Sequence, residues 1–581
     1  MKPCFSVILL FGTTLFLLFQ GCTARRTDSA SIRVRWAHDP ETIDPLQLTN
    51  QMALDAASLL HLSLMQIDLS TGEFAAALVE GPPTTRLLGD SLMQLSYRLR
   101  PGAQWDGGLP VLASDVAFTL RLMFCPGLPN ETPRLRFNFI RRLIPDPADP
   151  RHFKLECRGQ SPEYVQASGD FFILSEAALD PQHSLRRFSL ADLQARPVSA
   201  TPDTALEAVG RRYRNMPPDQ LPGCGPYRLA AWEKDRYLTF RRKPRWWADR
   251  LRAAPFVLRA RPVQLDFLII PDATTASLAL QRGELDVFPQ VPAREFARLR
   301  TLPAAKAALA FYSRASYDVV TVAFNTRRPA LADALTRRAL SRCFDAAGLL
   351  QATQLGEGQR SVGIISPTDR RYYNDSLAPV PFDPAGAAAL LHQAGWQRAA
   401  DQSRGWFRPG PHGEREALQL RVRYRANESM FATIALQFQA AAAGLGIAVA
   451  LQPTESGVLS ETLRQGDFDL CIRTLKGNPF MFNFMPLLHS HAVGAGNITG
   501  FGTPASDRLL EAMEAANLPV HKAVLLRRFQ AMMQTEAPMI PLFFLPTRIA
   551  ADRRLRGLHV SGLKPGYTAA GIERLPTASV P

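Results

Sequence analysis

The chain has 581 residues, of which 46% are hydrophobic and 20% are charged. This length suits two large domains or about three of average size, and the composition is typical of a globular protein with a substantial core. The formal net charge of +15 makes nucleic acid, a membrane surface or an acidic ligand conceivable partners. Only 8 of the 67 basic residues are Lys and the Arg residues are scattered, which argues against a nucleic-acid-binding patch.

The N-terminus predicts export. Lys2 precedes an apolar run over 5–19, which is too short to span a bilayer comfortably and is typical of a signal-peptide core. The run ends in Gly21-Cys22, and a polar stretch follows to residue 31. A small residue directly before Cys resembles a bacterial lipobox. We therefore expect a signal peptide over 1–21 and a lipidated Cys22 with a polar spacer over 22–31.

Two alternatives to lipidation stay open: an ordinary signal peptide with an incidental Cys, and a retained transmembrane anchor. All three place the rest of the chain outside the cytoplasm, and acyl chains on Cys22 would hold it at a membrane surface. The seven Cys residues contain no C-x-x-C pair, which argues against zinc ribbons and thioredoxin-type sites. Without Cys4 and Cys22, five remain, so at most two disulfides can form.

Apolar periodicity and turn residues predict strands and helices that alternate along the chain. In chain order we expect strands over 32–36 and 92–99, a helix over 114–124 capped by Ser114-Asp115, a hairpin over 227–240, a strand over 265–270, a helix over 274–282, a strand over 320–324, helices over 330–344 and 384–394, a strand over 418–424 and a helix over 428–443. This order predicts mixed sheets in α/β lobes. A Pro-rich stretch over 197–222 is a candidate domain junction.

Several segments carry a specific resemblance. The sequence is PETIDP over 40–45, YRLRPGAQWDGGLP over 97–110, GCGPYRL over 223–229, RGELD over 282–286 and APMIPL over 537–542. In this order, these segments resemble the bacterial extracellular solute-binding proteins of family 5, which bind oligopeptides, dipeptides and nickel complexes. The resemblance extends from about residue 32 to about residue 560.

The resemblance implies a two-lobed α/β periplasmic-binding-protein fold of the Venus-flytrap type. It has mixed sheets and an extra domain inserted in the first lobe. The first lobe is expected over 32–56, 196–300 and 536–581, the inserted domain over 57–195, and the second lobe over 301–535.

The resemblance also implies a function without catalysis. The chain is expected to be the substrate-binding lipoprotein of an ABC importer, a monomer that captures a peptide or peptide-like solute between its lobes. It would deliver the solute to a permease driven by a separate ATPase, and needs no cofactor. Two alternatives stay open: an anchored sensor or interaction module without transport, and a binder of a non-peptide solute that is anionic or a metal chelate.

Two segments and one further residue are the candidate ligand contacts: Thr49, Asn50, Gln51, Arg473, Thr474, Leu475, Lys476, Gly477, Asn478 and Asn497. In peptide binders of the family, the second segment usually carries an Asp that pairs with the peptide's α-amine. Here the stretch over 475–479 is LKGNP, which contains no acid. Lys476 in that place would repel an ammonium group and attract an anion. The alternative is that Lys476 faces solvent and another acid serves.

Two further patterns carry less weight. His489 and His491 alternate and could contribute to a transition-metal site, but no third ligand is evident nearby, so we predict no metal. Trp246-Trp247 is expected to pack in the core rather than to stack on a ligand.

Overall fold

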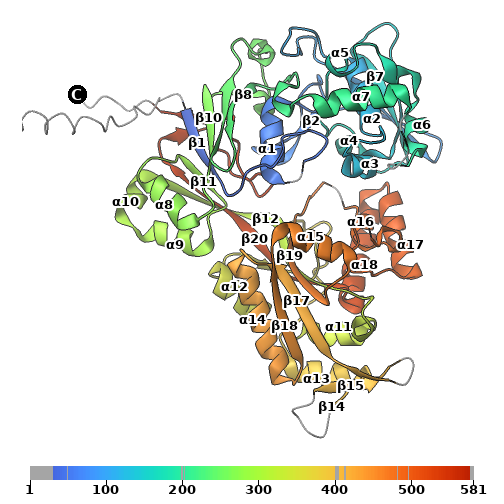
Figure 1. Ribbon diagram of the computed structural model, residues 1–581, viewed down its shortest axis with the longest axis vertical. Coiled ribbons are helices and arrows are strands. Elements are labelled where there is room, and N and C mark those ends of the chain that lie inside the picture. Colours follow the sequence, from blue (N-terminus) through green and yellow to red (C-terminus); the bar gives the residue numbers. More distant parts are fainter. Residues whose placement is uncertain are drawn as a thin grey trace, which may run out of the picture.

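The computed structural model describes residues 31–48, 50–197, 201, 203–398, 405–410, 414–480, 482–494 and 496–575. Figure 1 shows two lobes, connected by the long strands β12 (Leu309–Phe324) and β20 (Met539–Asp552). The predicted signal peptide and Cys22 lie outside the described residues. Within the described part, no helix is both long and apolar enough to cross a membrane.

One 11-stranded mixed sheet passes through both lobes. Its order is β18 (Ala448–Thr454), β17 (Gln419–Arg425), β19 (Leu470–Leu475), β12, β20, β11 (Val287–Pro289), β1 (Ser31–Trp36), β10 (Gln264–Ile269), β9 (Tyr237–Arg242) and β8 (Tyr227–Glu233), with β13 (Gln359–Arg360) beside β20. Parallel pairs flank β1 and β17, and the other pairs are antiparallel.

The strands β12 and β20 serve both lobes. The register between them shifts between Ala315 and Val319, and an irregularity of this kind bends a strand pair. On one side of the shift β20 pairs also with β11, and on the other side β12 pairs also with β19. The predicted boundaries at 300/301 and 535/536 stay predictions, since no single residue divides two lobes that share two strands.

The chain between α1 and α7 contains a separate four-stranded sheet with several helices, and the predicted inserted-domain bounds of 57–195 stay a prediction. The antiparallel strands are β4 (Thr84–Leu88), β5 (Leu92–Arg98), β7 (His152–Arg158) and β6 (Ile140–Pro145), in that order. The helices are α2 (Ala113–Leu122), α3 (Glu131–Phe137), α4 (Tyr164–Ala167), α5 (Glu176–Leu179) and α6 (Leu190–Ala195), and the hairpin β2 (Met65–Asp68) and β3 (Glu73–Ala76) precedes them. One continuous core joins this region to β1, β9 and β10.

Helices cover the sheet in both lobes (Figure 1). In the second lobe, β12 residues alternate between two cores: Val320 and Val322 face the helices α11–α14, while Val319 and Ala323 pack with residues of α16–α18. This alternation is what a strand covered on both faces requires. The helices are α11 (Ala334–Ser341), α12 (Ala346–Gln354), α13 (Pro384–Gln393), α14 (Ser429–Gly444), α15 (Ser456–Gln465), α16 (Met485–Leu488), α17 (Pro504–Ala515) and α18 (Pro519–Glu536).

In the first lobe, α8 (Ala273–Gln281), α9 (Ala293–Thr301) and α10 (Pro303–Ala308) share a core with Phe288 and Ala550. The helix α1 (Gln51–Leu60) packs beside β8, and α7 (Thr204–Asn215) lies within the Pro-rich stretch over 197–222 that was expected to be a junction. Small sheets complete the described fold: β14 (Gln397–Arg398) with β15 (Trp406–Pro409) and β16 (Arg415–Ala417), and β21 (Leu555–Arg556) with β22 (Glu573–Arg574).

Three predicted elements need correction. The helix expected to be capped by Ser114-Asp115 begins at Ala113, because the Asp115 carboxylate accepts the N–H of Leu112 from inside the first turn. The helix expected over 330–344 is a short 3-10 turn (Pro329–Leu331) followed by α11, because Asp333 caps a new helix by accepting the N–H of Thr336. The strand expected over 320–324 extends back to Leu309.

Candidate ligand-binding cleft

The helix α1 forms one wall of a cavity in the first lobe. Asn50 caps this helix, because its side-chain oxygen accepts the N–H of Ala53 at 2.9 Å. Gln51 begins the helix and donates to the Asp55 carboxylate one turn later, at 2.8 Å. Gln51 and Asp55 line a cavity of about 220 Å³ together with Lys564 and apolar side chains that include Phe172 and Phe256. The first lobe therefore presents a mainly apolar cavity that also contains a few polar and charged side chains.

The second lobe carries a larger cavity, of about 350 Å³. It is lined by Leu475 at the end of β19 and by Lys476, Gly477 and Asn478, which follow. Tyr317 of β12 and the aromatic residues Phe482, Phe484 and Phe544 complete much of the wall. Gly477 lies so close to β12 that a Cβ atom there would be 2.2 Å from the backbone oxygen of Tyr317. Only glycine permits this approach.

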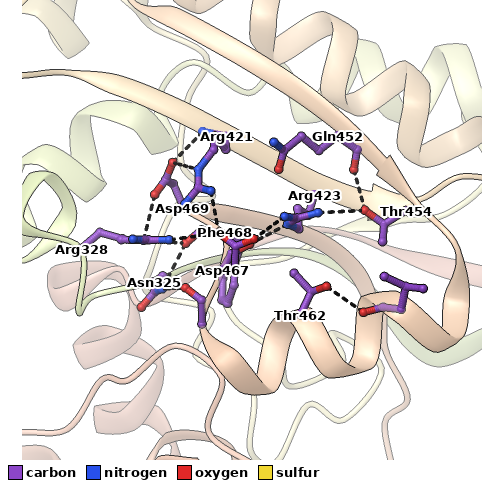
Figure 2. A network of polar contacts seen from close by, with 12 residues as sticks. Asn325, Arg328, Arg421, Arg423, Gln452, Thr454, Thr462, Asp467, Phe468 and Asp469 are labelled. Carbon is purple, nitrogen blue, oxygen red and sulfur yellow. Dashed lines mark hydrogen bonds and ion pairs between the residues drawn. The ribbon is translucent and has the colours of Figure 1, made fainter.

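A polar network fixes the start of β19 (Figure 2). Arg421 and Arg423 of β17 each form an ion pair of 2.6 Å with Asp467. Arg328 binds Asp469 at 3.2 Å, and the side-chain amide of Asn325 donates to the carbonyl of Gly466 at 2.9 Å. Because the turn before β19 is held in this way, the position of the segment at its other end, 475–478, is also set.

Charged side chains from the two lobes influence one another's pKa values. Burial raises the pKa of Asp55 to about 7, while the hydrogen bond from Gln51 and the charges of Lys564 and Lys476 oppose the rise. Lys476 is an exposed lining residue of its cavity, yet desolvation by the surrounding atoms lowers its pKa, and nearby Lys564 lowers it further. Lys564 itself pairs with Asp318 at 2.6 Å. Acidic and basic groups from both lobes thus meet in one region.

A family model described as the middle part of the bacterial extracellular solute-binding proteins, family 5, matches residues 90–495. This chain belongs to that family. The resemblance that the sequence motifs indicated is therefore confirmed.

Individual relatives and solved structures are consistent with this family assignment. The dipeptide-binding protein of Pseudomonas aeruginosa is 22% identical, over 90% of this chain and 91% of that protein. The oligopeptide-binding protein AppA of Bacillus subtilis, solved with a nonapeptide, gives a TM-score of 0.74 at 17% identity, covering 94% of this chain and 99% of that one. NikZ of Campylobacter jejuni, solved with Ni(L-His), gives 0.71 at 16%, covering 94% and 100%.

These comparisons confirm the two-lobed periplasmic-binding-protein fold with mixed sheets. They also agree with the expectation of a solute-binding protein rather than an enzyme, because the relatives named are binding proteins.

The predicted ligand contacts of this family 5 protein lie in different surroundings. Gln51 lines the first-lobe cavity, and Leu475, Lys476, Gly477 and Asn478 line the second-lobe cavity. Arg473 and Thr474 lie within β19, paired with Thr321 and Val320 of β12, and line neither cavity. Burial lowers the pKa of Arg473, and its Nε is a buried donor without an acceptor among the described residues. Thr49 lies outside the described residues.

Asn50 and Asn497 have structural roles. The amide of Asn50 is used by the cap of α1 and by a hydrogen bond to Pro40 at 3.3 Å. Asn497 is buried; its amide donates to the carbonyls of His489 and Phe501, and its oxygen accepts from Thr499 and Gly500. Both amides organise their own surroundings, and a contact of either one with a ligand stays a prediction.

Sequence reasoning missed Asp55, Asp318, Tyr317 and Lys564, which this solute-binding protein brings to the same region. For Asp55 there was a signal: it is the one acid in the otherwise apolar and small-residue run over 52–60 and lies four residues after Gln51. A side chain at that spacing shares the face of a helix with the predicted contact. No sequence pattern indicated Lys564, because its C-terminal segment lies beside α1 only in the folded chain.

The His pair, the Trp pair and the cysteines have structural surroundings. His489 is buried, lies 3.4 Å from Glu511 and accepts the N–H of His491 on its Nδ1. In the described part of the chain, no group of three His, Cys, Asp or Glu residues could hold a metal ion. Trp246 and Trp247 are buried and both indoles donate to the carbonyl of Cys224. The five described Cys residues are buried free thiols.

Proposed function

We propose that this chain is the substrate-binding component of an ABC importer and captures a peptide or peptide-like solute between its two lobes. The observation that carries the proposal is the pair of cavities on facing lobes, one beside α1 and one beside the segment after β19. Closure of two lobes around a ligand by a hinge motion is a recognised binding mechanism. The bent strand pair β12–β20 offers such a hinge.

The segment after β19 is suited to an extended ligand. Among the described residues, no backbone carbonyl accepts the N–H groups of Gly477 or Asn478. Free backbone groups at a strand end can pair with the main chain of a peptide, which gives affinity without selecting side chains. The aromatic wall of Phe482, Phe484 and Phe544 adds apolar surface for ligand side chains. The relatives named for dipeptides and oligopeptides support this ligand class.

Native mass spectrometry tests the ligand class. The secreted chain carrying Cys22→Ser is purified without detergent, and masses are recorded before and after denaturation. We expect a series of peptide masses that is released on unfolding. A single non-peptide mass would replace the peptide assignment with a specialised solute. Delivery is tested separately: cells that lack the gene should take up the co-purified peptides more slowly than the parent strain.

We also propose that Cys22 carries a lipid that anchors the protein to a membrane. The support is the apolar run over 5–19 followed by Gly21-Cys22. The wild-type protein should fractionate with membranes and require detergent for release, whereas Cys22→Ser should appear in the soluble periplasmic or extracellular fraction. Equal membrane association of the two would mean that another segment holds the protein.

A further inference from the structure

Basic residues concentrate at one edge of the large sheet. The segment over 226–263, which comprises the hairpin β8–β9 and the loop that leads to β10, contains 11 Lys and Arg residues but only 3 Asp and Glu residues. Although Arg occurs along the whole chain, the excess of positive charge in this short segment is more than half of the formal net charge of +15. A surface with so much charge of one sign attracts an anionic partner.

Ion pairs neutralise only part of this charge. Four of the basic side chains pair with acids, namely Arg236, Arg242, Lys243 and Arg261. Five others are exposed and form neither an ion pair nor a side-chain hydrogen bond within the described part of the chain: Arg228, Arg241, Arg245, Arg250 and Arg252. The charge of these five side chains is therefore available to a partner.

Two of the five arginines lie directly opposite each other in the sheet, because Arg228 of β8 is paired in register with Arg241 of β9. The same row continues across the sheet through Gln264 of β10 to Ser31, the first residue of β1. Residues opposite each other on antiparallel strands carry their side chains on the same face, with Cβ atoms about 5 Å apart, and like charges in this arrangement repel. We call Arg228 and Arg241 the arginine pair.

The adjacent acid on this face does not neutralise the arginine pair. Asp266 lies two residues after Gln264, and its carboxylate accepts hydrogen bonds from Thr239 at 2.7 Å and from Gln264 at 2.9 Å. No ion pair joins it to either arginine in the described part of the chain. An anion from outside the protein would therefore relieve the repulsion within the pair.

The row that contains the arginine pair begins close to the proposed lipid anchor. Eight residues separate Cys22 from Ser31, and a fully extended chain of this length spans at most about 30 Å. Neighbouring strands are about 4.8 Å apart, so the two arginines lie about 10 to 15 Å from Ser31 across the sheet. With Cys22 acylated, both arginines are within reach of the headgroups of the same membrane.

We propose that the arginine pair lies against the anionic phospholipid headgroups of the membrane that holds the anchor. The edge of the first lobe that contains β8 and β9 (Figure 1) then faces the lipid. Lipid anchor and arginine pair together orient the protein, which a flexible tether alone does not do. The inference goes beyond solute capture, and it uses the proposed lipidation of Cys22 only for the reach of the tether.

Protection of an exposed sheet edge is a simpler role for these arginines. The strand β8 is the last strand of the large sheet, and charged side chains on an edge strand discourage pairing with another chain. A single charge on β8 serves that purpose, whereas Arg241 lies on the next strand inward. Edge protection predicts no preference for anionic lipid, so a vesicle experiment separates the two roles.

The test uses the secreted chain carrying Cys22→Ser, which has no acyl chain. Its co-sedimentation is measured with vesicles of pure phosphatidylcholine and with vesicles that also contain phosphatidylglycerol. We expect a preference for the anionic vesicles that declines as the salt concentration rises. Adding Arg228→Gln and Arg241→Gln should weaken binding to the anionic vesicles about 20-fold, because each basic residue near an anionic surface contributes about fivefold.

A matched control removes the same charge elsewhere. Arg508→Gln combined with Arg528→Gln replaces two exposed arginines on α17 and α18 that form no ion pair within the described part of the chain. Binding to the anionic vesicles should change less than about twofold, because charges far from the lipid are screened. Replacing Arg228 and Arg241 by Lys should preserve binding, since the lipid surface attracts either cation, and unchanged thermal unfolding shows that each variant folds.

Three results would overturn the proposal: equal binding of the parent chain to both kinds of vesicle, unchanged binding after Arg228→Gln and Arg241→Gln, or an equal loss in the control. The proposed function is tested separately, because peptide capture by the same parent chain in solution involves no lipid. Loss of the vesicle preference with peptide capture intact removes this inference alone.

Discussion

The folded protein disfavours the ionised form of the Asp55 carboxyl group. Its pKa rises from an ordinary value of 3.8 to about 7, mainly because burial removes water from the carboxylate. Between these two values the native protein holds a proton that the unfolded chain releases. Stability therefore falls as the pH rises through this range, since the unfolded state binds fewer protons.

Replacing Asp55 by Asn should remove this pH dependence. At pH 8 the ligand-free variant should be more stable than the wild type by about 2 kcal/mol, after allowing for screening at a partly exposed site. The difference should become small at about pH 3, where the wild-type carboxyl is mostly protonated in both states. Urea unfolding of the two proteins at about pH 3 and about pH 8 measures it. Equal stability at both values would mean that Lys564 and Lys476 already compensate the charge.

At the scale of single residues, sequence patterns locate segments, while the role of each side chain depends on its neighbours. The segment over 475–478 lines a cavity, whereas the side-chain amides of Asn50 and Asn497 form hydrogen bonds in a helix cap and in a loop. Amide side chains organise local backbone as readily as they bind ligands. Which role applies depends on the neighbouring backbone groups, and these are known only from the folded chain.

The segment after β19 owes its position to one close approach. At Gly477 a Cβ atom would lie 2.2 Å from the backbone oxygen of Tyr317 and 2.8 Å from its Cβ. Neither atom belongs to the far end of a flexible side chain, so the segment itself must move if a side chain is added. The cavity wall formed by Lys476 and Asn478 would move with it.

Gly477→Ala should therefore weaken ligand binding more than it weakens the fold. Overpacking of this kind typically costs about 1–3 kcal/mol, and displacement of the wall should lower affinity for the co-purified ligand about tenfold. Gly444→Ala, at the end of α14 where nothing lies within 4 Å of the added atom, is the control and should leave affinity unchanged. Titration calorimetry and thermal unfolding of the variants separate the two effects. Unchanged affinity in Gly477→Ala would show that this wall does not contact the ligand.

Element prediction succeeded where the pattern was local. The hairpin β8–β9 and the helices α8 and α13 lie close to the expected ranges, because turn residues and apolar spacing define them within a few residues. The first half of β12 was missed because the residues 309–318 do not alternate clearly in polarity. They are extended because β20 pairs with them, and β20 follows more than 200 residues later. Such pairing is invisible to a local pattern.

At the scale of the whole molecule, the shared strand pair β12–β20 is one connection between the lobes. Another contact lies across the cleft, where Glu163, just before α4, binds the Nζ of Lys522 on α18 and accepts the N–H of Phe482 at 3.2 Å. Phe74 and Phe480 form an edge-to-face contact beside it, with ring centroids 4.9 Å apart. We call the contacts of Glu163 with Lys522 and Phe482 the interlobe bridge.

Glu163→Gln should shift the ligand-free protein toward a more open shape. Lys522 is buried, with only 5% of its side chain exposed, and a buried ammonium group without its carboxylate is costly. Opening returns it to water, so the radius of gyration measured by small-angle X-ray scattering should increase. Dissociation of bound ligand should also become about tenfold faster, because the closed state loses on the order of 1–2 kcal/mol.

A control variant and a double variant test whether the interlobe bridge itself keeps the protein closed. Glu131→Gln, at an exposed glutamate at the start of α3, removes the same charge from the same region and should change neither quantity. Lys522→Met should open the protein less than Glu163→Gln, because it leaves no buried ammonium group unpaired. In the double variant, the buried charge that penalises Glu163→Gln is absent, so closure should largely return. If Glu163→Gln leaves the radius of gyration unchanged, the hinge strands alone set the closed shape.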